Sequence, residues 1–246
     1  MVTKNQKKLI RSLNQKKNRK NNRLFVAEGV KVINEFLDAS LHLKHLFILN
    51  EAQHLFPDSL LLIPQIVSPT ELQQLSFLKT AQKAVAVFEI PELKTPNPSK
   101  GLQLALDDIS DPGNLGTIIR LCDWFGISDL ICSENTVDCF NPKVVQATMG
   151  SLTRVSIIYT NLEAYLKDTK LPVIGTFMDG NNVYQTNLPD KGIIVMGNEA
   201  NGISPKIKAF ISQKISIPRF GQLQHAESLN VATATAILLS EFKRRT

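Results

Sequence analysis

The clearest structural signal in the C-terminal half of this 246-residue chain is the segment Ile193-Ile194-Val195-Met196-Gly197-Asn198-Glu199-Ala200-Asn201-Gly202-Ile203-Ser204. Its first four residues are all apolar, which is typical of a strand buried on both faces, and Gly197-Asn198 then ends that strand. Ser204 favours the start of a helix. A buried strand, a polar glycine loop and a helix together predict a parallel sheet that binds ligands at the carboxyl ends of its strands.

The same alternation of strand and helix runs through residues 100–246. The expected strands are 102–106, 130–132, 155–158, 173–176, 193–196 and 215–217. The expected helices are 115–125, 143–149, 162–167, 205–211 and 229–243. Continuous apolar strands separated by helices predict an α/β fold, with a buried, mainly parallel sheet and helices on both faces.

A proline-rich linker separates this half from the N-terminal residues 1–95. Pro91, Pro96 and Pro98 can continue neither a helix nor a central strand, so we assign residues 96–99 to the end of the linker. Ahead of it, the expected strands are 24–27, 46–49, 61–67 and 85–88, and the expected helices are 30–39 and one beginning at residues 68–71. This alternation predicts a small α/β domain over residues 1–95 and a larger domain over residues 100–246.

The net charge of +6 is concentrated at the N-terminus. Residues 1–23 contain nine Lys or Arg and no acidic residue, whereas the other 223 residues contain 19 basic and 22 acidic side chains. Such a basic arm gains affinity for a polyanion by releasing counterions, without reading its sequence. The alternative is a solvated basic tail with no partner.

Composition excludes several classes of protein. No apolar run approaches the roughly 20 residues that a membrane span needs, and no apolar signal segment follows the basic N-terminus. The three cysteines, Cys122, Cys132 and Cys139, form no CxxC pair, and their odd number argues against a disulfide framework. We therefore expect a cytoplasmic protein without a metal site.

A first polar loop, Asp107–Gly116, precedes an expected helix. Pro112-Gly113 favours a tight turn, and Asn114 is a good N-cap for the helix that follows. Apolar residues form one stripe of that helix, and Arg120 falls on the opposite face. Arg120 is either a solvated residue paired with Asp123 or a functional cation, and a solvated helix alone does not explain the elaborate turn before it.

The loop Gly197–Ser204 nearly matches a phosphate-binding P-loop. That motif requires Lys where Ile203 stands, and the Lys makes much of the phosphate contact. The chain also contains no G-x-G spacing, so the dinucleotide-binding fingerprint is absent. A nucleotide-hydrolysing enzyme therefore stays only as an alternative, beside a plain glycine turn between two elements.

A third polar loop follows the strand expected at 215–217 and runs from Pro218 to Asn230. Ser228 is a natural N-cap for the last helix, whereas Asn230, in the first turn, has no evident capping role. That helix is rich in alanine, which allows a neighbour or a ligand to approach its backbone closely. Taken alone, this segment indicates a capped and packed C-terminal helix.

Together and in this order, the three loops resemble the three motifs of the SpoU family of RNA 2′-O-methyltransferases, which belongs to the SPOUT class. The matching residues are Asn114-Leu115-Gly116 with Arg120, Gly197-x-Glu199-x-x-Gly202, and Ile217-Pro218 with Ser228-Leu229-Asn230. Residues 19–40, with Phe25-Val26-Ala27-Glu28-Gly29, also resemble the start of the RNA substrate-binding domain that many members carry. The resemblance implies a SPOUT fold with a C-terminal trefoil knot, and a homodimer with the site near the subunit interface.

The resemblance also implies the residues of the site. Those expected to bind S-adenosylmethionine, mostly through backbone groups, are Gly197, Ile217, Leu229, Thr176 and Met196. Those expected to carry catalysis and shape the site are Arg120, Asn114, Glu199, Ser228 and Asn230. Guanidinium stays protonated in proteins, so we expect Arg120 to orient the ribose hydroxyl and stabilise its developing charge, although the sequence leaves a role as base open.

Ribosomal RNA is the favoured substrate, because an added N-terminal domain suits a structured ribosomal target, and transfer RNA is the alternative. The rival of another class is a catalytically inactive RNA-binding protein of the same fold, and the intact motif residues argue against it. The loop of residues 222–227, with His225 and Glu227, is longer than the commonest family pattern, so no role is carried over to either residue.

Overall fold

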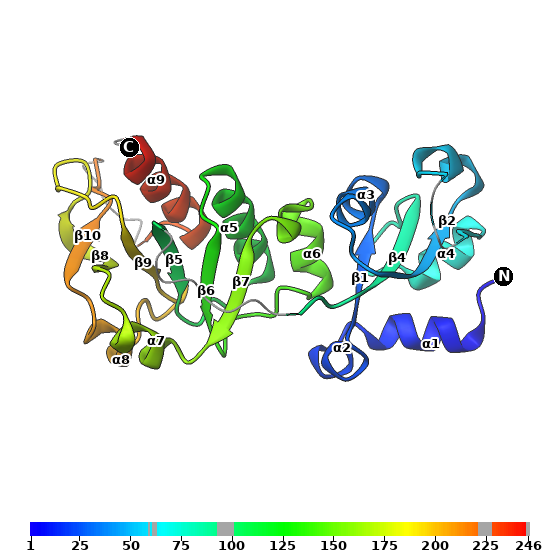
Figure 1. The fold of residues 1–246 in the computed structure, drawn as a ribbon, viewed down its shortest axis with the longest axis horizontal. Coiled ribbons are helices and arrows are strands. Elements are labelled where there is room, and N and C mark those ends of the chain that lie inside the picture. Colours follow the sequence, from blue (N-terminus) through cyan, green and yellow to red (C-terminus); the bar gives the residue numbers. More distant parts are fainter. Residues whose placement is uncertain (59, 61–62, 93–100, 221–227, 245–246) are drawn as a thin grey trace. The chain divides into compact units, whose positions relative to one another are not determined.

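The computed structural model describes residues 1–58, 60, 63–92, 101–220 and 228–244 of the chain (Figure 1). The chain forms two compact units. The first unit combines Met1–Glu92 with Asp138–Thr153, and the second combines Leu93–Val137 with Arg154–Thr246. The segment Asp138–Thr153 is therefore an excursion from the second unit into the first, which the sequence pattern had not indicated.

The first unit is built on a four-stranded sheet in the order β1-β4-β2-β3. Its strands are β1 (Leu24–Glu28), β2 (Leu43–Ile48), β3 (Gln65–Ile66) and β4 (Ala84–Glu89). β4 is antiparallel to β1 and β2, whereas β3 is parallel to β2. Of the expected strand at 61–67, only β3 forms, because Ile63, Pro64 and Val67 are described and lie outside it. Residues 61 and 62 lie outside the described part of the chain.

Helices complete this unit. They are α1 (Lys4–Ser12), α2 (Lys16–Asn22), α3 (Val30–Asp38), α4 (Pro69–Leu75) and α6 (Pro142–Thr148), with 3-10 turns at Asn50–Leu55 and Ser151–Thr153. A capping box between Ser68 and Glu71 starts α4 at the expected place. In α6, contributed by the excursion, Val144 and Val145 are buried, and the helix packs on β1.

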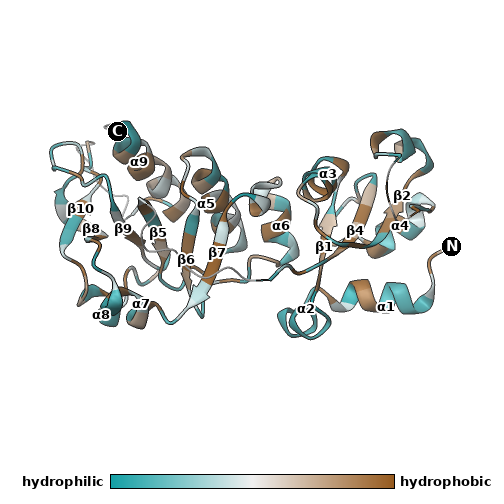
Figure 2. Ribbon diagram, viewed as in Figure 1, coloured by the Kyte–Doolittle hydropathy of each residue, from teal (hydrophilic) through white to brown (hydrophobic). Residues whose placement is uncertain are grey.

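The basic arm folds into α1 and α2. A capping box between Thr3 and Gln6 begins α1, and the arm buries Ile10 and Leu13 completely in the core of the first unit. Figure 2 shows α2 hydrophilic throughout and α1 with a single hydrophobic band. α1 is amphipathic, but Lys, Arg, Asn and Gln so dominate residues 4–22 that the sequence was interpreted as a charged arm, and its two helices were not predicted. The interpretation of residues 1–23 as a solvated tail is wrong.

The second unit contains a six-stranded sheet in the order β10-β8-β9-β5-β6-β7. Its strands are β5 (Leu102–Leu106), β6 (Asp129–Ser133), β7 (Ser156–Thr160), β8 (Val173–Asn182), β9 (Gly192–Met196) and β10 (Gln213–Ser216). Every pairing between neighbours in this sheet is parallel. The predicted buried parallel sheet is confirmed.

Helices cover both faces of this sheet. They are α5 (Pro112–Trp124), α7 (Leu162–Asp168), α8 (Pro205–Lys208) and α9 (Val231–Arg244). Figure 1 shows α5 and α9 on one side of the sheet and α7 and α8 on the other. On the α7 side, Ala105, Ile131 and Val195 pack with residues of both helices in one core cluster. The predicted α/β architecture is confirmed, and the knot stays a prediction because residues 221–227 lie outside the described part of the chain.

Candidate functional site

A cavity of about 890 Å³ lies in the second unit, at the carboxyl ends of β9 and β10 and beside the middle of β8. Its walls come from the polar loops after β5, β9 and β10, from β8 and from the start of α9. Nine of the ten predicted site residues line it: Asn114, Thr176, Met196, Gly197, Glu199, Ile217, Ser228, Leu229 and Asn230. Arg120 does not line it.

The loop after β9 closes on itself. The backbone N–H of Asn198 donates to the carbonyl of Gly202 at 3.0 Å, and the N–H of Gly202 donates back at 2.9 Å. A Cβ on Gly197 would lie 2.2 Å from the carbonyl carbon of Gly202, so only glycine allows this closure. Gly202 has a φ of +65°, and a Cβ there would meet no protein atom within 4 Å. Gly197 is therefore required by the loop itself.

Two contacts fasten this loop to the end of β5. The backbone N–H of Ser204 donates to Oδ2 of Asp107, a buried carboxylate, at 2.6 Å. The side-chain amide of Asn198 donates to the carbonyl of Asp108, also at 2.6 Å. In each contact, a side chain of one loop forms a hydrogen bond with the backbone of the other, so the loops after β5 and β9 are held together.

Glu199 joins the same two loops at the rim of the cavity. Its carboxylate accepts hydrogen bonds from the N–H groups of Ser110 and Asp111, both at 3.2 Å, and from Nδ2 of Asn114 at 3.0 Å. Partial burial raises the pKa of Glu199, but these hydrogen bonds outweigh it, and the pKa lies below its ordinary value. Glu199 is therefore ionised at neutral pH, and an ionised carboxylate matches this ring of donors.

Asn114 extends the network to the third loop. Its Oδ1 accepts a hydrogen bond from Nδ2 of Asn230 at 2.8 Å. Oδ1 of Asn230 accepts in turn from the N–H groups of Ala232 and Thr233, at 2.9 and 3.2 Å, in the first turn of α9. The side chains of Glu199, Asn114 and Asn230 therefore link all three polar loops.

The caps of α5 and α9 differ from those expected. Asp111 is the N-cap of α5, and its carboxylate accepts from the N–H of Asn114 at 2.8 Å. Proline suits the first helical position, so Asp111-Pro112 is the start signal, and the Asn114 side chain is available for the network. Asn230, and not Ser228, caps α9. The predictions that Asn114 caps a helix and that Asn230 does not were both wrong.

A bulge in β8 forms another part of the cavity wall. Lys214 of β10 pairs with Gly175, but the next residue, Ile215, pairs with Asn181, so residues 176–180 leave the regular ladder. A Cβ on Gly180 would lie 2.4 Å from the carbonyl carbon of Ile215, and only glycine permits this approach. Thr176 lies in the bulge, and its hydroxyl donates to the carbonyl of Val195 at 3.1 Å.

Several residues of the wall were not predicted from the sequence. Phe177 and Met178 come from the bulge, and Nζ of Lys214 lies 5.0 Å from the centre of the Phe177 ring. Arg219 lines the cavity just after β10. The available signal was Gly175 and Gly180 within one strand, because glycine inside a strand often marks a bulge.

Arg120 lies elsewhere on α5. It is exposed, and within the described part of the chain it makes no hydrogen bond or ion pair. The alternative pairing with Asp123 is wrong, because that carboxylate accepts from Nε of Arg154 at 2.9 Å. Six residues along a helix separate Arg120 from Asn114 by about 9 Å along the axis and about 120° around it.

Metal sites and membrane-spanning helices were also sought among the described residues. These residues contain no group of three or more His, Cys, Asp or Glu side chains that could hold a metal ion. None of their helices combines the length and the apolar character needed to cross a bilayer. His225 and Glu227 lie outside the described part of the chain.

Comparisons with known proteins cover both halves of the chain. Residues 101–240 match the SpoU rRNA Methylase family, and residues 4–86 match the MRM3-like substrate binding domain. The 23S rRNA (guanosine(2553)-2′-O)-methyltransferase RlmP of Bacillus subtilis (strain 168) is 31% identical over 244 residues, which cover 96% of this chain and 95% of that protein.

Solved structures resemble the chain over its full length. A TrmH-family structure from Porphyromonas gingivalis has a TM-score of 0.88 and 38% identity, with 100% of both chains covered. The AdoMet-bound rRNA methyltransferase from Sinorhizobium meliloti has a TM-score of 0.86 and 30% identity, covering 100% of this chain and 96% of that chain.

Proposed function

Because the chain belongs to the SpoU rRNA Methylase family, we propose that it transfers a methyl group from S-adenosylmethionine to a ribose 2′-hydroxyl of ribosomal RNA. The observation that carries this proposal is the hydrogen-bonded chain Glu199–Asn114–Asn230, which draws the three motif loops around one cavity. Ribosomal RNA, and not transfer RNA, is the substrate named for the similar proteins of Bacillus subtilis and Sinorhizobium meliloti.

The cavity suits S-adenosylmethionine in size and in chemistry. Its volume of about 890 Å³ falls within the range of roughly 300–1,000 Å³ that small-molecule sites occupy. Met196, Ile217 and Leu229 offer apolar contact for an adenosine group, and Glu199 places a negative charge on the wall of a site for a sulfonium cation. The bound cofactor supplies a methyl group that is already activated towards a nucleophile.

Glu199, Asn114 and Asn230 have a positioning role. Their polar atoms are engaged with one another and with the backbone of α9 and of the loop after β5. Held in this way, the loops keep the shape of the cavity wall constant. Alignment of the ribose oxygen with the methyl group depends on that constancy, because small displacements of reacting atoms lower the rate steeply.

Arg120 supplies positive charge to the reaction. Its guanidinium stays protonated, so it acts by donating hydrogen bonds to the 2′-oxygen and not by accepting a proton. Those hydrogen bonds strengthen as the hydroxyl loses its proton and negative charge develops on the oxygen. An exposed guanidinium without an acidic partner in the described residues is available for this task.

The active form is a homodimer whose interface includes an exposed stripe of α5. The stripe consists of Gly113, Thr117, Arg120 and Trp124, which share one face of the helix. Trp124 is 84% exposed, and an aromatic ring left in water favours burial against a partner. Because Arg120 does not line the cavity of its own chain, a two-fold interface here would let it serve the cavity of the partner.

Two further properties belong to the same proposal. The C-terminal chain is threaded as the trefoil knot of the SPOUT class. The protein acts in the cytoplasm, where ribosomal RNA is available and where its three free, buried cysteines stay reduced.

Methyl transfer in vitro tests the proposal. Purified protein and tritiated S-adenosylmethionine should label unmodified ribosomal RNA but not transfer RNA, and digestion should place the label in 2′-O-methyl nucleosides. Cofactor binding without transfer to any ribosomal RNA would favour an inactive RNA-binding protein. Hydrolysis of ATP, competing with S-adenosylmethionine for the cavity, would favour the nucleotide-hydrolysing alternative.

A further inference from the structure

The nine cations of residues 1–23 differ sharply in their surroundings. Eight are exposed, whereas the side chain of Arg19 is only 2% exposed. The chain contains no acidic residue before Glu28. Helices α1 and α2, together with Arg23 at the end of α2, therefore contribute eight exposed cations and no carboxylate of their own.

The cations of α1 form one stripe. Lys4, Lys7, Lys8 and Arg11 stand at the i, i+3, i+4 and i+7 positions of a single helix face, which spans about 10 Å along the axis. The other face turns Ile10 into the core, and it is completely buried there. The stripe is consequently held on a packed helix and not on a mobile chain.

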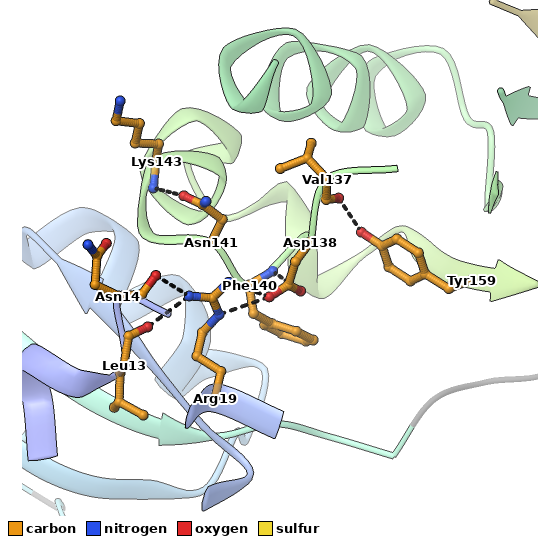
Figure 3. Close-up of polar contacts among 9 residues, drawn as sticks. All are labelled: Leu13, Asn14, Arg19, Val137, Asp138, Phe140, Asn141, Lys143 and Tyr159. Atoms are coloured by element: carbon orange, nitrogen blue, oxygen red, sulfur yellow. Dashed lines mark hydrogen bonds and ion pairs between the residues drawn. The ribbon is translucent and has the colours of Figure 1, made fainter. Parts of the chain in front are cut away.

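Arg19 holds α2 and the turn that precedes it (Figure 3). Its Nη1 donates to the carbonyls of Leu13 and Asn14, both at 2.8 Å. Its Nε and Nη2 donate to Oδ2 of Asp138 at 2.8 and 2.6 Å. With these donors engaged and the side chain buried, Arg19 sets the orientation of the two helices and takes no part in external contacts.

We propose that the exposed sides of α1 and α2 bind the sugar-phosphate backbone of a base-paired RNA stem, an inference that rests on the proposed function. Residues 1–23 contain no aromatic side chain, whereas proteins that read unpaired bases stack them on aromatic rings. Exposed amides such as those of Asn5 and Asn21 stand among the cations and suit phosphates and 2′-hydroxyls. Because α1 and α2 are already packed, their cations lose little conformational entropy when they bind a target of matching, fixed shape, and an A-form stem has a fixed shape.

The test compares RNA binding by two triple variants of the full-length protein. Lys4→Gln with Lys8→Gln and Lys20→Gln removes three charges from the proposed surface. The matched control removes three charges from exposed positions of the second unit, through Lys167→Gln, Lys170→Gln and Lys191→Gln. The probes are a fluorescent RNA duplex of about 16 base pairs, the span of a typical duplex-binding domain, and an unpaired strand of the same length.

The wild-type protein should prefer the duplex. Loss of three phosphate contacts should weaken duplex binding by the surface variant and lower its log–log salt slope by about 2 to 3, since each contact contributes about 0.9. The control variant should bind like the wild type. Charge-conserving Lys4→Arg, Lys8→Arg and Lys20→Arg should also bind like the wild type, which separates charge from packing.

Equal weakening in the surface variant and the control would overturn the inference, and so would a preference for the unpaired strand. Methyl transfer is measured in parallel on ribosomal RNA. Duplex binding by a wild-type protein that transfers no methyl group would contradict the proposed function and leave this surface standing. Methyl transfer by the wild-type protein, together with unchanged duplex affinity in the surface variant, would support the proposed function and contradict the RNA-binding surface.

Discussion

The two units of the molecule use polar side chains in opposite ways. In the second unit, Glu199, Asn114 and Asn230 meet where parallel strands end, and each is bonded to the next. In the first unit, the polar groups of α1 and α2 are mainly exposed cations, and only Arg19 among them is buried. The second unit's arrangement suits catalysis, which requires a few groups at fixed positions. The first unit's arrangement suits affinity for a polyanion, which requires many charges on a surface.

This contrast implies that substitutions in the two units should affect different measurements. Changes in the second unit should alter cofactor affinity or turnover. Changes in the first should alter its stability or its affinity for RNA. We expect the largest loss of stability where a buried ion pair is broken and the smallest where an exposed side chain is removed.

Arg19→Ala should produce the largest effect, on the stability of the first unit. The substitution leaves the largely buried carboxylate of Asp138 and two backbone carbonyls without their donor. Breaking a buried ion pair in this way costs about 3–5 kcal/mol. Denaturant unfolding measures the loss, with exposed Lys20→Ala as the control, and cofactor affinity should stay unchanged. A loss below about 1 kcal/mol, the size typical of surface ion pairs, would mean that Arg19 does not hold these helices.

Arg120→Ala should leave folding intact and remove turnover. The side chain is exposed, so the free energy of unfolding should change by no more than about 0.5 kcal/mol. Loss of a group that stabilises developing charge should lower the rate about 100- to 1,000-fold. Single-turnover methylation with saturating cofactor measures this, and Arg120→Lys should restore little if the planar fork orients the oxygen. A rate within a few-fold of wild type would remove Arg120 from the mechanism.

Gly197→Val should impair cofactor binding by deforming the loop after β9. Its Cβ would lie 2.2 Å from the carbonyl carbon of Gly202, so the backbone must move, at a cost of about 1–3 kcal/mol. Gly202→Ala meets no protein atom within 4 Å and adds only the strain of its positive φ, so it is the matched control. Calorimetric titration with S-adenosylmethionine compares the two. Equal affinity in Gly197→Val and wild type would show that loop closure does not shape the cavity.

Glu199→Gln should have only a small effect on stability, and that effect should depend on pH. The folded pKa of Glu199 lies below its ordinary value of 4.5, so its contribution is fully present above that pH. The contribution is lost as the pH falls through the folded pKa. Because the side chain is exposed, we expect less than about 1 kcal/mol. The difference in melting temperature between the two proteins should close in acid, and a gap that widens there would contradict this assignment.

The strands of the second unit could be predicted because burial on both faces leaves continuous apolar runs. In β9, for example, all five residues are buried. The start of α5 was harder to predict, because Asp111 and Asn114 are both good N-cap residues. Only the structure shows that Asp111 caps the helix and that the Asn114 side chain donates to Glu199 instead. The bulge in β8 depends on a register with β10 that no local pattern records.

The first unit was less predictable for a related reason. Arg19 is one of nine similar cations in the sequence, and its partner Asp138 lies 119 residues away. The excursion Asp138–Thr153 lies in the sequence between strands of the second unit. Its own helix therefore continues the alternation of strand and helix, and nothing local shows that it packs in the first unit. Local periodicity therefore predicts elements well and long-range pairing poorly.

Methylation of ribosomal RNA by this protein can be tested in cells, by mapping 2′-O-methyl groups in the ribosomal RNA of cells with and without it. We expect a specific ribose methylation to disappear in its absence, to return with the wild-type protein and to stay missing with Arg120→Ala. A ribosomal methylation pattern that is unchanged by loss of the protein would contradict the account.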